Sequence, residues 1–229
     1  MESLTDRIAG INLSEEITLT KLIRAAESVW NSGEIRRTPM LQGVQHCLPL
    51  ATYAKSCQEP IWAFSCLFLA FKMENMQVTG SFKFRGALHQ MSSLASTTDR
   101  LFTYSGGNYG KAFATMAQKL NLPATVLMPE SAPKDRVESM GVTPEVYPTM
   151  AEVVQKREEY RRKEGWRYLD PFDDIKLIQA YSTVGFEILQ SVPKPDVILV
   201  PCGGGGLLCG VASAIALKAR GPLTPIFEF

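Results

Sequence analysis

The chain has 229 residues, enough for one large or two small domains with a hydrophobic core. It is 45% hydrophobic and 21% charged with a formal net charge of +1, which gives no reason to expect nucleic acid or a membrane as partner. No basic segment followed by an apolar stretch begins the chain, and five cysteines without a CxxC pair predict reduced thiols, a cytoplasmic location and no metal site.

The first part of the chain predicts one helix and then irregular structure. Apolar residues recur at helical spacing over residues 18–31, and Gly33 ends the pattern. After Thr38 the chain is irregular until an apolar run at 61–71. That run is too short to span a bilayer and predicts one or two buried strands.

From about residue 81, short apolar strands alternate with helical segments. The expected helices cover residues 82–94, 109–120, 133–140, 151–163, 174–190 and 207–219, and the expected strands cover 101–104, 124–128, 145–147 and 196–200. This alternation is typical of an α/β fold with a parallel sheet. Ligands of such sheets gather at the carboxyl ends of the strands, where the glycine-rich loops of this chain fall.

Four consecutive glycines, residues 203–206, lie between the strand at 196–200 and the helix at 207–219. At such a junction glycines let successive backbone N–H groups converge on an anion, and the helix dipole strengthens the attraction. The spacing does not fit GxGxxG and no GK[ST] follows, so neither a dinucleotide fingerprint nor a P-loop is expected. A monophosphate cradle remains, with a tight turn or close helix packing as the alternative.

Lys83 lies in the segment TGSFKFRG, residues 79–86. An isolated lysine is usually a solvated surface residue. Here Gly80 and Ser81 can start a helix with Ser81 as N-cap, which places Lys83 in the first turn beside the positive end of the helix dipole. That position disfavours the ammonium form and frees the amine, as Schiff-base chemistry requires.

A third loop, SGGNYG at residues 105–110, lies between the strand at 101–104 and the following helix. It offers backbone N–H groups, one hydroxyl and one carboxamide at a helix N-terminus, which suits a substrate carboxylate. Alone it is a weak signal.

Together, the segments at 79–87, 105–110 and 201–210 resemble the fold type II (tryptophan synthase β-like) pyridoxal-phosphate enzymes in order and spacing. The resemblance is to the serine/threonine dehydratases (ammonia-lyases) and the related serine racemases, and it covers residues 38–219. It implies an α/β fold with parallel-rich sheets, helices on both faces, and pyridoxal 5'-phosphate as cofactor.

The same resemblance implies roles for individual residues. Lys83 would bind the cofactor as a Schiff base and act as the catalytic base. Phe82 would pack against the cofactor ring and Asn108 would bond the ring hydroxyl. The cofactor phosphate would be held by Gly203, Gly204, Gly205, Gly206 and the amide of Leu207. The substrate carboxylate would be received by Ser105, Gly107, Asn108 and Tyr109.

Two residues of this loop depart from the family pattern S-[SA]-G-N-H, because Gly106 and Tyr109 replace its second residue and its histidine. In serine racemases a serine at the position of Gly106 serves as an acid/base. Glycine cannot exchange a proton, so elimination is favoured over racemisation. The effect of Tyr109 on specificity is left open.

The resemblance also implies a division into domains. Residues 100–177 would form a small mobile domain, and residues 1–99 and 178–229 would form the large cofactor-binding domain. The connector from Thr38 to Lys72 is longer than the family's, and the chain is expected to be truncated, because half the sheet of the large domain would follow residue 229.

The function implied is that of an L-serine/L-threonine ammonia-lyase, which converts a β-hydroxy amino acid to a 2-oxo acid and ammonia. The alternatives are serine racemase-like activity and a catalytically silent truncated form. The expected partner is a small amino-acid substrate, L-threonine or L-serine. The preferred substrate and a homo-oligomeric state are left open.

Overall fold

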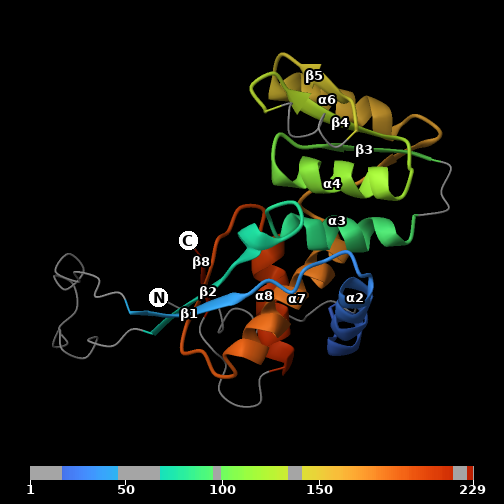
Figure 1. Ribbon diagram of the computed structural model, residues 1–229. Helices are drawn as coiled ribbons and strands as arrows, with labels where there is room; N and C mark the ends of the chain where they lie inside the picture. Colours follow the sequence, from blue (N-terminus) through green and yellow to red (C-terminus); the bar gives the residue numbers. More distant parts are fainter. Residues whose placement is uncertain (1–16, 46–67, 95–98, 134–140, 219–225, 229) are drawn as a thin grey trace.

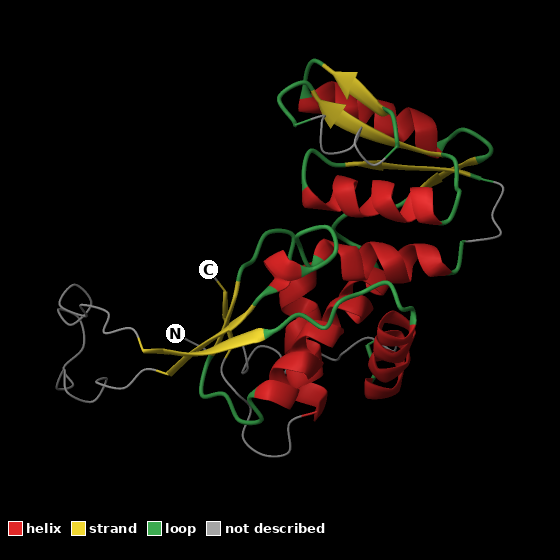
Figure 2. Cartoon of the chain, viewed as in Figure 1, coloured by secondary structure: helices red, strands yellow, loops and turns green. Residues whose placement is uncertain are grey.

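The computed structural model describes residues 17–45, 68–94, 99–133, 141–218 and 226–228. Its elements alternate along much of the chain (Figures 1 and 2). The helices are α2 (Leu19–Asn31), the 3-10 turn η3 (Glu74–Met76), α3 (Lys83–Ser92), α4 (Asn108–Lys119), α6 (Met150–Arg161), α7 (Ile175–Ser191) and α8 (Gly206–Lys218). The strands are β1 (Met40–Gln45), β2 (Phe68–Lys72), β3 (Arg100–Tyr104), β4 (Ala124–Pro129), β5 (Pro144–Tyr147), β6 (Trp166–Tyr168), β7 (Ile198–Val200) and β8 (Ile226–Glu228).

A four-stranded parallel sheet with the order β5-β4-β3-β6 lies between α4 and α6. Successive side chains of a strand point to opposite faces. Leu101 and Val126 therefore pack in the cluster that includes α4. Phe102 and Leu127 pack on the other face against Tyr160 of α6. The predicted α/β architecture with helices on both faces is confirmed.

The other half of the molecule consists of helices and two short sheets. Helix α3 packs on α4 and α7, and α7 packs along α8 (Figure 1). Close helix packing requires glycine here, because a Cβ on Gly185 would lie 2.7 Å from Ala214 Cβ and one on Gly210 would lie 2.6 Å from the Ile178 carbonyl oxygen. In the described residues β1 pairs with β2 antiparallel, and β7 pairs with β8 parallel.

Some predicted elements differ from the structure. Strands β1, β6 and β8 are not anticipated by the sequence, since each acquires its regular form by pairing with a strand distant in the chain, and β6 and β8 have only three residues each. The apolar run at 61–71 was expected to be buried, and this is wrong for its described end, where Phe71 is 47% exposed in β2. Residues 61–67 and most of the helix predicted at 133–140 lie outside the described residues.

A cluster of paired charges joins α3 to α7. The Arg85 side chain is fully buried, and its five N–H donors reach two carboxylates and a hydroxyl: Glu74 Oε1 and Oε2 at 2.8 and 2.9 Å, Glu187 Oε1 and Oε2 at 2.7 and 2.9 Å, and Thr183 Oγ1 at 2.9 Å. Lys72 Nζ lies 2.6 Å from Glu187 Oε2. Two cations thus face two carboxylates, and this balance makes the burial tolerable.

Replacing Glu187 with glutamine removes one negative charge from between Arg85 and Lys72. We expect the free energy of unfolding, measured by urea denaturation, to fall by about 3–5 kcal/mol, because two cations are then left with one carboxylate in a buried site. The matched control is Glu34→Gln, which breaks the pair with Lys119 in which both side chains are 40% exposed. Its cost should stay below about 1 kcal/mol. Equal losses in the two variants would contradict the importance of the buried cluster.

Candidate active site

Lys83 is the first residue of α3. Ser81 Oγ accepts the N–H of Lys83 at 3.3 Å and the Ser81 carbonyl accepts the N–H of Phe84 at 3.3 Å, so Ser81 caps the helix start as the sequence predicts. The assigned helix begins one residue later than the prediction, within the normal uncertainty of helix ends. This cap places Lys83 in the first turn of α3.

The amine of Lys83 lies in an aromatic surrounding. Its Nζ donates to the Pro171 carbonyl at 3.0 Å and lies 5.2–5.8 Å from the ring centroids of Phe82, Tyr109, Phe172 and Tyr181. Ring faces attract a cation, but removal of water from the amine outweighs this. Burial lowers the pKa of Lys83 to about 8, although the nearby Asp170 carboxylate acts in the opposite direction. Roughly a tenth of the amine is then neutral at pH 7.

The Ser105–Gly110 loop follows the carboxyl end of β3 and leads into α4. Ser105 Oγ accepts the N–H groups of Gly107 and Gly110 at 3.3 and 3.0 Å, which holds the loop in one shape. Asn108 is exposed at the first helical position. The first N–H groups of a helix have no acceptor within the helix, so this end can receive an anion.

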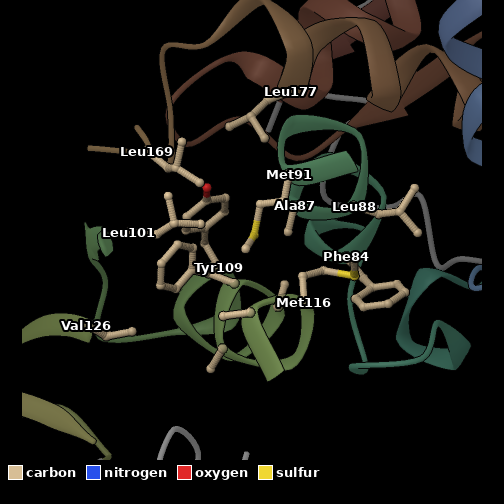
Figure 3. Packing of buried hydrophobic residues seen from close by; sticks show 14 of the residues in the cluster. Phe84, Ala87, Leu88, Met91, Leu101, Tyr109, Met116, Val126, Leu169 and Leu177 are labelled. Atoms are coloured by element: carbon tan, nitrogen blue, oxygen red, sulfur yellow. The ribbon is translucent and has the colours of Figure 1, made fainter. Parts of the chain in front are cut away.

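Tyr109 has a different environment from the other residues of the loop. Its side chain is 3% exposed and lies in the cluster between α3 and α4 (Figure 3). Its hydroxyl donates to Gln90 Oε1 in α3. Its ring forms part of the wall around the Lys83 amine, and only its backbone N–H belongs to the open end of α4.

The glycine loop lies between β7 and α8, as predicted. Gly203 and Gly204 are exposed, and Gly205 has φ +80°, in the left-handed region that favours glycine. Leu207 is the second residue of α8. The backbone of the loop is therefore accessible at the positive end of a helix, where a phosphate binds well.

Two aromatic residues bring Lys83 and the glycine loop into one site. Phe172 lies over the Lys83 amine, and its Cδ1 is 2.8 Å from where a Cβ on Gly204 would stand. Tyr181 also lies beside the amine, and its ring is 3.5 Å from the Cβ position of Gly206. Sequence reasoning missed both residues, because neither belongs to a recognisable motif and each reaches the site only through packing between distant segments.

The residues present fit a phosphorylated aldehyde. Lys83 has a lowered pKa, and only a layer of aromatic side chains separates its amine from the glycine loop. That loop is exposed and lies at the N-terminus of a helix. In the part of the chain that the structure describes, no group of three or more histidine, cysteine, aspartate or glutamate side chains could hold a metal ion, and no helix is long and apolar enough to cross a membrane.

Solved structures show the same fold. A threonine deaminase from T.th. matches 92% of this chain and 64% of its own length, with a TM-score of 0.71 and 30% identity. Maize serine racemase matches 93% of this chain and 61% of its own length, with a TM-score of 0.73 and 26% identity. These likenesses confirm the predicted fold type II architecture.

The family model for "Pyridoxal-phosphate dependent enzyme" matches residues 36–227. The chain belongs to this family, and the cofactor predicted from the motifs is confirmed as that of the family.

Among curated relatives, the chain is 41% identical over 155 residues to L-threonine ammonia-lyase of Geobacter sulfurreducens, which covers 63% of the chain and 38% of that protein. It is 37% identical to L-threonine dehydratase catabolic TdcB of Escherichia coli K12, over 66% of the chain and 47% of the relative. It is 36% identical to L-threo-3-hydroxyaspartate ammonia-lyase of Saccharomyces cerevisiae, over 69% of the chain and 49% of the relative. The chain thus spans about half the length, or less, of these relatives.

The lowered pKa of Lys83 is testable by competitive labelling. In protein freed of cofactor, we expect the reactivity of Lys83 toward acetic anhydride to rise with pH and to reach half its maximum near pH 8, because the amine reacts only when neutral. Asp170→Asn should move this midpoint to lower pH, since the carboxylate raises the pKa. Peptide mass spectrometry gives the labelling at each lysine. A midpoint near the ordinary value of 10.5 would contradict the environment described.

The glycine loop can be tested with two alanine substitutions. Gly205→Ala should lower the free energy of unfolding by about 1–2 kcal/mol, because a Cβ is strained in the left-handed region. Gly203→Ala is the matched variant, since nothing lies within 4 Å of its Cβ position and its φ is not positive. Its cost should be within about 0.5 kcal/mol. Urea denaturation measures both, and a reversed order would mean that the loop has another conformation.

Proposed function

We propose that this chain carries the catalytic lysine and the cofactor anchors of an L-threonine/L-serine ammonia-lyase. The observation that supports it most is the position of Phe172, which lies beside both the Lys83 amine and Gly204 and so joins the two anchors around one site. The relatives named as threonine ammonia-lyase or dehydratase support the choice of reaction.

Each anchor has a proposed role. Lys83 would bind the aldehyde of the cofactor covalently, Phe82 would pack against its ring and Asn108 would bond its ring hydroxyl. The N–H groups of the segment from Gly203 to Leu207 would hold the phosphate. The edge-on packing of Phe82 against Tyr181, with ring centroids 4.9 Å apart, supports this role of Phe82, because it holds the phenyl ring beside the amine.

The substrate carboxylate is proposed to bind at the N-terminus of α4, to Ser105, Gly107, Asn108 and Tyr109. Tyr109 contributes its backbone N–H in this proposal, because its hydroxyl already donates to Gln90. The internal hydrogen bonds of Ser105 support a loop that is formed before the substrate arrives.

The proposed chemistry needs one base. When bound, pyridoxal phosphate supplies an electron sink for the pair left by the departing α-proton. The incoming substrate amine would take the place of Lys83 on the cofactor aldehyde, and this exchange would free the Lys83 amine. The freed amine would then accept the α-proton, and its lowered pKa would leave a neutral fraction able to do so. Loss of the β-hydroxyl and subsequent hydrolysis give a 2-oxo acid and ammonia.

The environment of Gly106 supports elimination over racemisation. Glycine has no side chain that could exchange a proton with the substrate. A Cβ at this position would lie 2.9 Å from Ala132 Cβ, so a larger residue would require the loop to move. Serine racemase-like activity is for this reason ranked below elimination. A catalytically silent form is the other alternative.

Two further assignments remain proposals. The small mobile domain is residues 100–177, and the large domain is residues 1–99 and 178–229. The separation of the four-stranded sheet from the β1–β2 and β7–β8 sheets supports this division. A cytoplasmic location is proposed from the cysteine content alone.

Borohydride reduction followed by peptide mapping tests the assignment of Lys83. We expect a pyridoxyl group on Lys83, and we expect Lys83→Ala to lose the cofactor absorbance. Steady formation of 2-oxo acid from L-threonine or L-serine should fall by at least about 10²-fold in this variant, because it removes both the general base and the covalent anchor of the cofactor. Lys156→Ala is the control, because Lys156 lies in α6 and pairs with Glu159.

Three outcomes would contradict parts of the proposal. Modification of another lysine would remove Lys83 from its role. Cofactor binding without 2-oxo acid formation would favour the silent form. Formation of D-serine from L-serine would favour the racemase.

A further inference from the structure

Gln90 lies two turns after Lys83 on α3, so both side chains face the same side of the helix. Its side chain is almost fully buried, with 1% of the residue exposed. Buried glutamine is costly unless its amide is fully hydrogen-bonded. Gln90 meets that requirement through three partners, which belong to Tyr109, Asp170 and Asp174.

The direction of these hydrogen bonds follows from chemistry. Gln90 Nε2 donates to the Asp170 carbonyl at 3.1 Å and to Asp174 Oδ2 at 2.7 Å, two groups that can only accept. The amide oxygen therefore faces the Tyr109 hydroxyl, which must donate. Burial raises the pKa of Tyr109 well above its ordinary value, so the hydroxyl keeps its proton.

Each partner controls a part of the site. Tyr109 belongs to the loop at the N-terminus of α4. The Asp170 carbonyl directly precedes Pro171, whose own carbonyl accepts the Lys83 amine. Asp174 caps α7 by accepting the N–H of Lys176 at 2.7 Å.

We propose that Gln90 is a positioning residue that holds the Ser105–Gly110 loop and the Pro171 carbonyl in fixed places relative to Lys83. It acts through Tyr109 on one side and through Asp170 and Asp174 on the other. The kinetic part of this proposal rests on the proposed function, in which the loop binds the substrate carboxylate. The structural part does not.

The structural part is tested by amide hydrogen exchange of the full chain without added cofactor. Gln90→Leu keeps the size of the side chain and removes all three hydrogen bonds. We expect peptides covering 105–113 and 169–175 both to exchange about fivefold faster, the effect of one ordinary hydrogen bond on a local opening equilibrium. Tyr109→Phe should accelerate only the first peptide.

Tyr160→Phe is the matched control for Tyr109→Phe. Tyr160 is a residue of α6 that is 7% exposed, and it packs on the sheet face that α6 covers. Its hydroxyl donates to Glu145 Oε2 at 2.6 Å. This variant should leave both peptides unchanged. Unchanged exchange of both peptides in Gln90→Leu would overturn the proposal, whatever the activity of the chain.

The kinetic part is tested with L-threonine and the cofactor-loaded protein. Tyr109→Phe should raise KM about tenfold with kcat within about twofold, because the loop loses the tie that holds it and Lys83 is untouched. The double variant Tyr109→Phe/Gln90→Leu should have the KM of Gln90→Leu alone, since the tyrosine acts through the glutamine. Independent, multiplicative effects of the two substitutions would overturn this part.

Failure of the proposed function is distinguishable from failure of this inference. Absence of turnover in the unmodified chain would remove the ammonia-lyase assignment, and the exchange measurements would still decide the role of Gln90. Turnover in which Tyr160→Phe raises KM as much as Tyr109→Phe would keep the function and reject Gln90 as a specific positioning residue.

Discussion

The pairing of Arg85 with Glu74 and Glu187 is the constraint on which the rest of the site depends. Arg85 follows Lys83 by two residues, so the carboxylates that hold the guanidinium also fix the start of α3. A rotation or shift of α3 would separate buried charges and incur their desolvation cost without compensation. Pairs of this kind add little net stability compared with apolar packing. Their effect here is to favour the position of α3 in which the Arg85 guanidinium reaches both carboxylates, and Lys83 begins that helix.

Around that fixed lysine, the site is built from strand-to-helix junctions and aromatic packing. The junctions before α4 and α8 supply accessible N–H groups, and the rings of Phe172 and Tyr181 fill the space between the amine and the glycine loop. The same rings remove water from the amine, so the packing that assembles the site also lowers the pKa of Lys83. The same aromatic packing thus brings the parts of the site together and lowers the pKa of the Lys83 amine.

The departure at Tyr109 acquires a physical meaning from its contact with Gln90. A buried phenol that donates to a buried amide ties α4 to α3, and the amide in turn donates to the segment from Asp170 to Asp174. One side chain thereby connects the Ser105–Gly110 loop, the segment that carries the carbonyl beside Lys83, and the start of α7. In the proposed function, the affinity for substrate is accordingly expected to depend on Gln90, which does not itself touch the substrate.

The sequence by itself determined the fold class from its alternating strands and helices. A serine cap before a helix and glycines at strand-to-helix junctions are likewise local signals, and they singled out Lys83 and the two glycine-rich loops. The cofactor family followed from the resemblance of these segments to a known family. It did not reveal β1, β6 or β8, and it wrongly placed Phe71 in a buried strand. Phe172, Tyr181, Gln90 and the Arg85 cluster were decided only by the tertiary structure. Their roles come from contacts between segments distant in the chain, and whether such side chains are buried, paired or exposed depends on which surfaces meet after folding.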